Sequence, residues 1–167
     1  MSKQKITDIY GNTQEVECLS CAIQQGIVKA PGGLIAESKH FKAEQDFEIP
    51  IPGFIIVVSK RHVTSIDEFT EEEQIDFIKF WVKVRKAMRQ ALGLDNVYFV
   101  QEEDTEHHFH VWLFPRYDWM TEEKFGRKIN SVRPIMEYAR KNMKTPENLK
   151  AVDEATEELR EALSKDN

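Results

Sequence analysis

The stretch that most constrains this chain runs from His107 to Arg116 and reads HHFHVWLFPR. It contains three of the five histidines, and its other residues are apolar as far as the closing arginine. Phe, Val, Trp and Leu favour a β-strand, which the proline is expected to end. Because side chains alternate along a strand, His108, His110 and Trp112 are expected to share one face. A lone histidine on a strand is usually only packed or solvated, whereas neighbouring imidazoles can ligate a metal, transfer a proton or act as a nucleophile.

The composition points to a single globular domain. With 167 residues, 41% of them hydrophobic and 31% charged, the chain is long enough to bury a core. Its formal net charge of −6 argues against general nucleic-acid binding and against membrane-surface attachment, since both need a basic face. The sequence has no apolar run as long as a membrane span, and its first residues lack the apolar core of a signal peptide. We therefore expect a cytoplasmic protein.

The two cysteines form a Cys-x-x-Cys pair, Cys18 and Cys21, before a short helix that Gly26 is expected to end. They are too close together in the sequence for a disulfide between them to connect distant parts of the fold. In a reducing compartment such a pair indicates a metal or redox site. A closed zinc site needs two further ligands, and His62, which follows an apolar run at 54–59, is a third ligand candidate.

Strands are expected at 34–38, 40–47, 54–59 and 97–100. The best-defined helix runs from Thr70 to Leu92 and begins with a capping box formed by Thr70 and Glu73. Its apolar side chains recur at steps of three or four and predict one core-facing stripe, made of Phe77, Trp81, Val84, Met88 and Ala91 and widened by Ile78 and Val82. Further helices are expected within 127–143 and from 145 to 163. The last is amphipathic and either packs on the domain or mediates dimer contacts.

In their order along the chain, these features resemble the histidine triad (HIT) superfamily from Cys18 to Arg116. In its bacterial members a Cys-x-x-Cys knuckle opens the domain, and a central strand ends in a basic pair and a histidine. A later strand carries the signature His-φ-His-φ-His-φ-φ-Pro-Arg, where φ is apolar. The resemblance implies an α+β, HIT-like domain: an antiparallel sheet of about five strands with a long helix packed on it, plus C-terminal helices. It divides the chain into an N-terminal segment (1–17), the HIT-like domain (18–116) and a helical extension packed on the same domain (117–167).

The Pro-Arg pair sets the register of this signature. Its first position falls on His108, its second on His110 and its third on Trp112. By the resemblance, His110 is the nucleophile that attacks an α-phosphorus and forms a nucleotidyl-histidine, which water then resolves. His108, Trp112 and Arg116 are expected to contact the substrate.

The resemblance also implies a zinc site. The ligands of the zinc-binding bacterial members correspond here to Cys18, Cys21, His62 and His108, with His107 as the alternative fourth ligand. A Cys₂His₂ set is closed and tetrahedral, so the zinc is expected to be structural and to join the knuckle to the strand that carries the nucleophile.

Three departures from the family pattern bear on catalysis. Trp112 replaces the third histidine, and an indole has one N–H donor but no basic nitrogen, so it cannot shuttle a proton. Phe54 stands where the family has a histidine after the proline-glycine turn. The acidic run at 102–106 replaces a polar phosphate-binding loop, and negative charge beside a phosphate is unfavourable.

The first hypothesis is therefore a hydrolase of the HIT type, a nucleotide phosphohydrolase or nucleotidyl hydrolase acting on a nucleoside phosphate or dinucleoside polyphosphate. The alternative is a zinc-stabilised nucleotide-binding domain with weak or no catalysis. A third hypothesis is redox chemistry at the cysteine pair. The expected partners are a small-molecule nucleotide and a second copy of the chain, because HIT proteins often form dimers and the helix at 70–92 offers a face for one.

Overall fold

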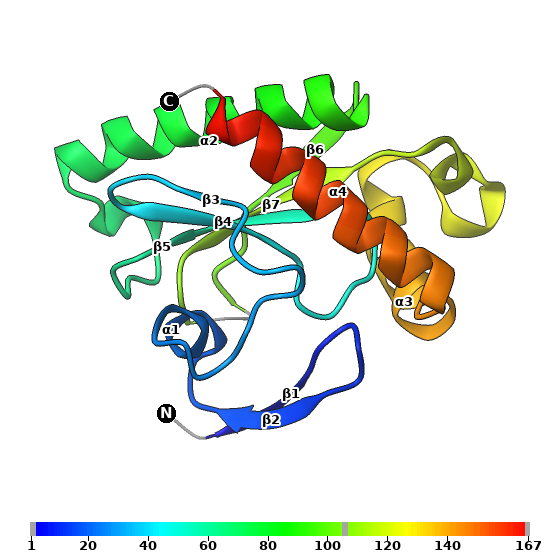
Figure 1. Cartoon of the computed structure of the whole chain (residues 1–167), viewed down its shortest axis with the longest axis horizontal. Coiled ribbons are helices and arrows are strands. Elements are labelled where there is room, and N and C mark those ends of the chain that lie inside the picture. Colours follow the sequence, from blue (N-terminus) through cyan, green and yellow to red (C-terminus); the bar gives the residue numbers. More distant parts are fainter. Residues whose placement is uncertain (1–2, 105–106, 166–167) are drawn as a thin grey trace.

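The centre of the fold is a five-stranded antiparallel sheet with the strand order β3-β4-β5-β7-β6 (Figure 1). The computed structural model describes residues 3–104 and 107–165. The strands are β3 Ala36–Glu37, β4 Phe41–Gln45, β5 Ile55–Ser59, β6 Val97–Val100 and β7 His110–Pro115. This sheet, with a long helix and C-terminal helices, confirms the α+β fold expected from the sequence.

Strands β5 and β7 lie next to each other at the middle of the sheet, where both of their faces are covered. Their register pairs Val58 with His110 and Ile56 with Trp112. All six residues of β7 are buried. The β-branched residues of β5 suit a position that is packed on both sides.

The strand expected to begin at His107 begins three residues later, at His110. Before it, the chain runs beside the loop that follows β5: Phe109 donates its N–H to the carbonyl of Val63, with an N···O distance of 2.6 Å. The predicted alternation of faces therefore applies from His110 onward. His108 precedes the strand, and its side chain is placed by this loop contact instead.

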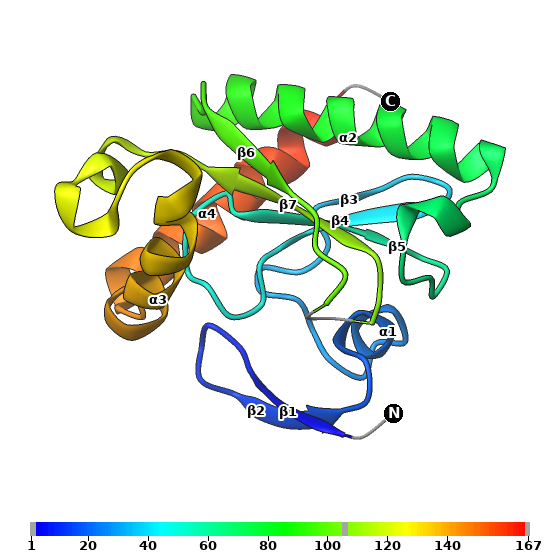
Figure 2. The same ribbon diagram turned by 180° about the vertical axis from the view of Figure 1, so that it is seen from behind.

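The helix α2, Glu71–Leu92, covers one face of the sheet (Figures 1 and 2). The expected capping box is present, since the hydroxyl of Thr70 accepts from the Glu73 N–H and the Glu73 carboxylate accepts from the Thr70 N–H. The helix ends at Gly93, whose φ of +64° is the left-handed conformation that glycine adopts without strain. The core stripe is narrower than predicted, because Ile78 and Val82 are exposed.

The C-terminal helices are α3, Val132–Asn142, and α4, Pro146–Ser164. Helix α4 begins at Thr145, whose side chain accepts the N–H of Asn148. Leu159 and Leu163 of α4 are buried in the same apolar cluster as α2 and the sheet. Of the two roles considered for this helix, the structure shows packing on the domain.

The opposite face of the sheet is covered by two segments that are far apart in the sequence (Figure 2). One is the hairpin of β1, Gln4–Thr7, and β2, Thr13–Val16, with the short helix α1, Leu19–Gln24. The other consists of 3₁₀ turns between 118 and 131, followed by α3. Each segment buries its own apolar cluster, and a cavity lies between them on the sheet. Across residues 3–104 and 107–165, none of the helices is both long and apolar enough to span a bilayer.

Candidate metal centre and catalytic cavity

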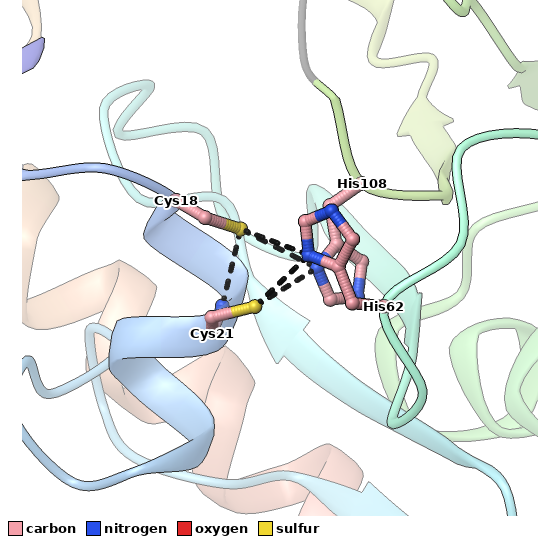
Figure 3. A group of neighbouring side chains, drawn as sticks. All are labelled: Cys18, Cys21, His62 and His108. Atoms are coloured by element: carbon pink, nitrogen blue, oxygen red, sulfur yellow. Dashed lines mark hydrogen bonds between the residues drawn. The ribbon is translucent and has the colours of Figure 1, made fainter. Parts of the chain in front are cut away.

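Four side chains of metal-ligating type meet at one end of the central strands: Cys18, Cys21, His62 and His108 (Figure 3). Their ligating atoms all lie within 4.8 Å of one another. Cys18 caps the N-terminus of α1 and Cys21 lies in its first turn, so both thiols leave the helix on the same side. His62 follows β5 and His108 precedes β7. The pairing of these strands therefore brings the two imidazoles together.

The distances within this group fit a tetrahedral zinc site. A zinc ion with Zn–S bonds of about 2.3 Å and Zn–N bonds of about 2.1 Å holds its sulfur and nitrogen ligands roughly 3.6 Å apart. The Sγ of Cys18 lies 3.4 Å from Nδ1 of His108 and 3.8 Å from Nδ1 of His62. The Sγ of Cys21 lies 3.5 Å and 3.1 Å from the same two nitrogens. The four residues can thus hold zinc with little rearrangement.

The second ring nitrogen of His108 determines which nitrogen is free to bind a metal. Its Nε2 lies 2.8 Å from the carbonyl oxygen of Ser59. A carbonyl can only accept, so Nε2 carries the proton and Nδ1 presents its lone pair toward the two sulfurs. Burial also lowers the pKa of His108, which favours this neutral form. A hydrogen bond from the second nitrogen to a backbone carbonyl is the usual way a protein orients a ligating imidazole.

The cysteines add an electrostatic argument for a cation. Burial, followed by the neighbouring Cys18 side chain, raises the pKa of the Cys21 thiol to about 11. Two thiolates side by side are therefore unfavourable without a compensating charge. A divalent ion supplies that charge and deprotonates coordinating thiols. His107, the alternative fourth ligand, is exposed and lies outside the group of four.

His110, at the start of β7, is held by the backbone of the same segment. Its Nδ1 lies 2.9 Å from the carbonyl oxygen of His108. By the same argument Nδ1 carries a proton, so the neutral form of this imidazole has its lone pair on Nε2. The side chain is 8% exposed and lines the cavity on the sheet. In that form, a buried imidazole with a fixed tautomer at the wall of a cavity is a suitable nucleophile.

The cavity has a volume of about 290 Å³ and is bounded by a floor and two sides. Its floor is the face of the sheet that carries Val58, His110 and Trp112. One side is formed by the N-terminal hairpin and α1, including Ile6 and Leu19, and the other by Met136 and its neighbours on α3. The C-terminal segment thus contributes directly to the cavity that contains His110.

Trp112 both lines this cavity and packs into the core beneath it. Its ring centroid lies 6.3 Å from that of His110 on the same strand face. It meets Phe54 edge to face, with centroids 5.9 Å apart. Phe54 is fully buried. The two aromatic residues that depart from the family pattern are therefore in contact with each other.

Arg116 lies away from the cavity. Its guanidinium donates to the hydroxyl of Ser131 at 2.8 Å and stacks over the ring of Tyr98 at 4.9 Å. These contacts join the end of β7 to the turn that precedes α3. The structure does not bring Arg116 to His110.

Two charged residues in the cavity wall were not singled out from the sequence. Arg133 of α3 lies over the ring of Trp112, with its Cζ 5.1 Å from the ring centroid, and pairs with Glu102 at 2.6 Å. Glu44 of β4 is 7% exposed, and no hydrogen bond to its side chain is found among the described residues. The local sequence around Arg133 does not distinguish it from the other arginines in helices, so the sequence could not predict its place at the cavity. Glu44 could have been found, because a glutamate inside a predicted strand is unusual and indicates a buried carboxyl group. Part of the acidic run, 105–106, lies outside the described residues.

Burial raises the pKa of Glu44 to about 7, and the nearby charge of Lys42 only partly offsets this effect. Asp46, on the same cavity wall, also has a pKa raised to about 7 by burial, although it accepts two backbone N–H groups. These carboxyl groups therefore give the cavity a charge that changes near neutral pH.

Comparison with known proteins identifies the fold. No protein-family model matches the chain. The chain is 27% identical over 105 residues to protein Hit of Bacillus subtilis (strain 168), covering 60% of this chain and 71% of that protein. A Zn-bound histidine triad family protein from Mycobacterium smegmatis superposes with a TM-score of 0.63 at 21% identity, over 89% of this chain and 94% of that one. A hypothetical histidine triad nucleotide-binding protein from Sulfolobus tokodaii strain7 gives a TM-score of 0.64 at 18% identity, over 89% and 93%.

The buried carboxyl of Glu44 predicts a specific pH dependence of stability. Its pKa is higher in the folded protein, about 7, than the ordinary 4.5, so the folded state holds a proton that the unfolded state releases between these values. Stability should therefore fall as pH rises from about 4.5 to 7. We expect Glu44→Gln to be more stable than wild type at pH 8, by up to roughly 3 kcal/mol, and about equal at pH 4.

Urea unfolding of both proteins across this pH range checks the prediction, with exposed Glu158→Gln as the matched control. Asp46 titrates in the same range in all three proteins, so the difference between variants isolates Glu44. Parallel pH profiles for wild type and Glu44→Gln would contradict the burial argument.

Proposed function

Because the chain has the histidine triad fold, we propose that it is a nucleotidyl hydrolase acting on a nucleoside phosphate or dinucleoside polyphosphate, with His110 as the nucleophile. The observation that carries this proposal is the hydrogen bond from Nδ1 of His110 to the carbonyl of His108. In the neutral imidazole, this hydrogen bond places the lone pair on Nε2, beside a cavity large enough for part of a nucleotide. The nucleotide-binding name of the Sulfolobus tokodaii structure adds support for the ligand class.

In the first step, Nε2 of His110 attacks the α-phosphorus, a P–N bond forms, and the bond to the leaving oxygen breaks with its electron pair. The imidazole becomes cationic, and its Nδ1–H remains donated to the His108 carbonyl, which stabilises that charge. In the second step, water attacks phosphorus, the P–N bond breaks, and the water proton leaves to solvent. Each half of the reaction has a lower barrier than direct hydrolysis.

The absence of a basic nitrogen at Trp112 favours certain leaving groups. An indole cannot supply a proton to a departing amine or alkoxide. Phosphate and polyphosphate are weak bases that depart without one. The site is therefore suited to substrates with a phosphoanhydride leaving group, which favours polyphosphates over phosphoramidates.

We expect His110→Ala to reduce turnover of nucleoside and dinucleoside polyphosphates by about a thousandfold or more, since removal of a nucleophile eliminates the covalent route. Initial rates over a panel of these substrates provide the measurement. His107→Ala is the matched control, because this histidine is three positions away, exposed and outside the metal group. Unchanged turnover in His110→Ala would sink the proposal. Nucleotide binding without turnover by wild type would favour the alternative, a zinc-stabilised binding domain with weak or no catalysis.

We further propose that the group of four holds a structural zinc ion. Cys18, Cys21, His62 and His108 have the donor types and spacing for it, and one structural neighbour is described as Zn-bound. Bound zinc would supply four coordinate bonds that join α1 to the two central strands. Because His108 also supports His110, this site would position the nucleophile. His108 is not among the residues that line the cavity, and the substrate contact expected of it from the sequence stays a prediction.

Cys18→Ser, or removal of metal by a chelator, is then expected to destabilise the whole domain, because metal binding is coupled to folding. A ligand present at about a thousand times its Kd stabilises by roughly 4 kcal/mol. For a chain of this size that corresponds to a loss of about 8–16 °C in Tm. Calorimetry with metal analysis checks this, with Ser20→Ala in the same helix as the control. A Cys18→Ser protein that melts like wild type would rule out a structural metal.

The exposed apolar residues of α2 support a proposal that the protein forms a homodimer. Ile75, Ile78 and Val82 follow one another at helical spacing and are between 44% and 48% exposed. Phe99 of the edge strand β6 continues this surface and contacts Trp81, with ring centroids 4.2 Å apart. Such a patch on a helix and an adjoining sheet edge suits a self-complementary twofold interface. The cytoplasmic location expected from the sequence stays a prediction.

Light scattering coupled to gel filtration tests the dimer. Wild type should run at twice the chain mass, and Val82→Glu at the chain mass, because a charge buried at the interface is unpaired. Ile129→Glu is the control, since Ile129 is 55% exposed in the turns before α3, away from α2. A monomeric wild type would refute this arrangement.

A further inference from the structure

The guanidinium of Arg133 is held in place by two different contacts at the cavity that contains His110. It stacks over the ring of Trp112, with Cζ 5.1 Å from the ring centroid. Its Nη2 donates to the Glu102 carboxylate at 2.6 Å. Among the described residues, its other N–H donors make no hydrogen bond. Arg133 is thus oriented but keeps donors available for a ligand.

The surroundings of Trp112 need a cation if a phosphate group is to bind there. Trp112 itself is uncharged, and Glu102 in the same wall carries a negative charge that would repel a phosphate. The ion pair with Arg133 balances that charge. The cavity wall has two other cations among the described residues: Lys5 of β1, and Arg140, which lies further along α3 and is paired with Glu48. Arg133 is the one with a contact to the histidine strand.

We propose that Arg133 binds the phosphate group that is transferred to His110, and that Trp112 and Glu102 position its guanidinium for this task. The proposal rests on the function proposed above and names a further residue of the same site. An arginine suits this role because its planar fork of donors matches phosphoryl oxygens and stacks on an indole face. Helix α3 would thus supply, from outside the histidine strand, the charge that Trp112 lacks.

This inference explains how the acidic residue at position 102 is compatible with a phosphate site. Glu102 is 18% exposed and engages one edge of the guanidinium. It therefore limits the orientations of Arg133 and acts as a positioning residue. Donors that are oriented before the substrate arrives stabilise developing phosphoryl charge without reorganisation.

The experiment compares wild type, Arg133→Ala, Arg133→Lys and the control Arg127→Ala in the full chain. Arg127 is also an exposed arginine of the C-terminal segment, but it does not line the cavity. Calorimetric titration with adenosine 5′-monophosphate and with adenosine measures binding with and without a phosphate. Steady-state rates on the best polyphosphate substrate give kcat and KM separately.

We expect Arg133→Ala to reduce both kcat/KM and the affinity for the monophosphate by about 100-fold, with adenosine affinity unchanged. Arg133→Lys should recover only part of this loss, because the charge returns without the planar fork. Arg127→Ala should match wild type. If wild type shows no turnover but Arg133→Ala still loses affinity for the monophosphate and not for adenosine, Arg133 is confirmed as the phosphate-binding residue. Only the hydrolase proposal is then contradicted.

Three results would overturn the inference. The first is normal turnover and monophosphate affinity in Arg133→Ala, which would leave the hydrolase proposal standing. The second is an equal loss of affinity for adenosine and for its monophosphate, which would mean that Arg133 only maintains the cavity. The third is a wild type that binds the monophosphate no more tightly than adenosine.

Discussion

The residue on which the rest of the site depends is His108. Its Nε2 is bound to the carbonyl of Ser59 at 2.8 Å, its Nδ1 faces the two thiols, and its own carbonyl accepts from Nδ1 of His110. One residue therefore joins the central strand, the group of four metal-ligating side chains and His110. Because it lies just before β7, its backbone is free of the strand ladder and can make this last contact. A change that moved His108 would disturb all three at once.

The two departures from the triad pattern form one structural unit. Phe54 and Trp112 meet edge to face at 5.9 Å within the apolar cluster that also supports α3. At these two positions, where the family pattern has histidines, this chain has an apolar contact between aromatic rings. This apolar contact provides a surface on which α3 packs. The packing then brings the guanidinium of Arg133 over the ring of Trp112.

Segments from both ends of the chain contribute to the cavity. The sheet supplies His110 and Trp112, but the walls come from the N-terminal hairpin with α1 and from α3. These segments are far apart in the sequence and meet across the sheet face. The size and charge of the cavity therefore depend also on residues outside the histidine strand, including Arg133 and the buried Glu44.

Several features could be read from the sequence alone because they depend on local chemistry. Alternation and β-branched runs predicted the strands, and the Thr70 capping box predicted the start of α2. Separated motifs in a fixed order predicted the fold. The tertiary structure decided the rest. The hydrogen bond from Phe109 to the carbonyl of Val63 precedes a strand that begins only at His110. Helix α2 packs on the sheet through a narrower face than predicted, which leaves Ile78 and Val82 exposed. Arg116 was turned toward Ser131, and Arg133 and Glu44 were brought to the cavity. These outcomes depend on which surfaces meet across the sheet, and periodicity within one segment carries no information about its distant neighbours.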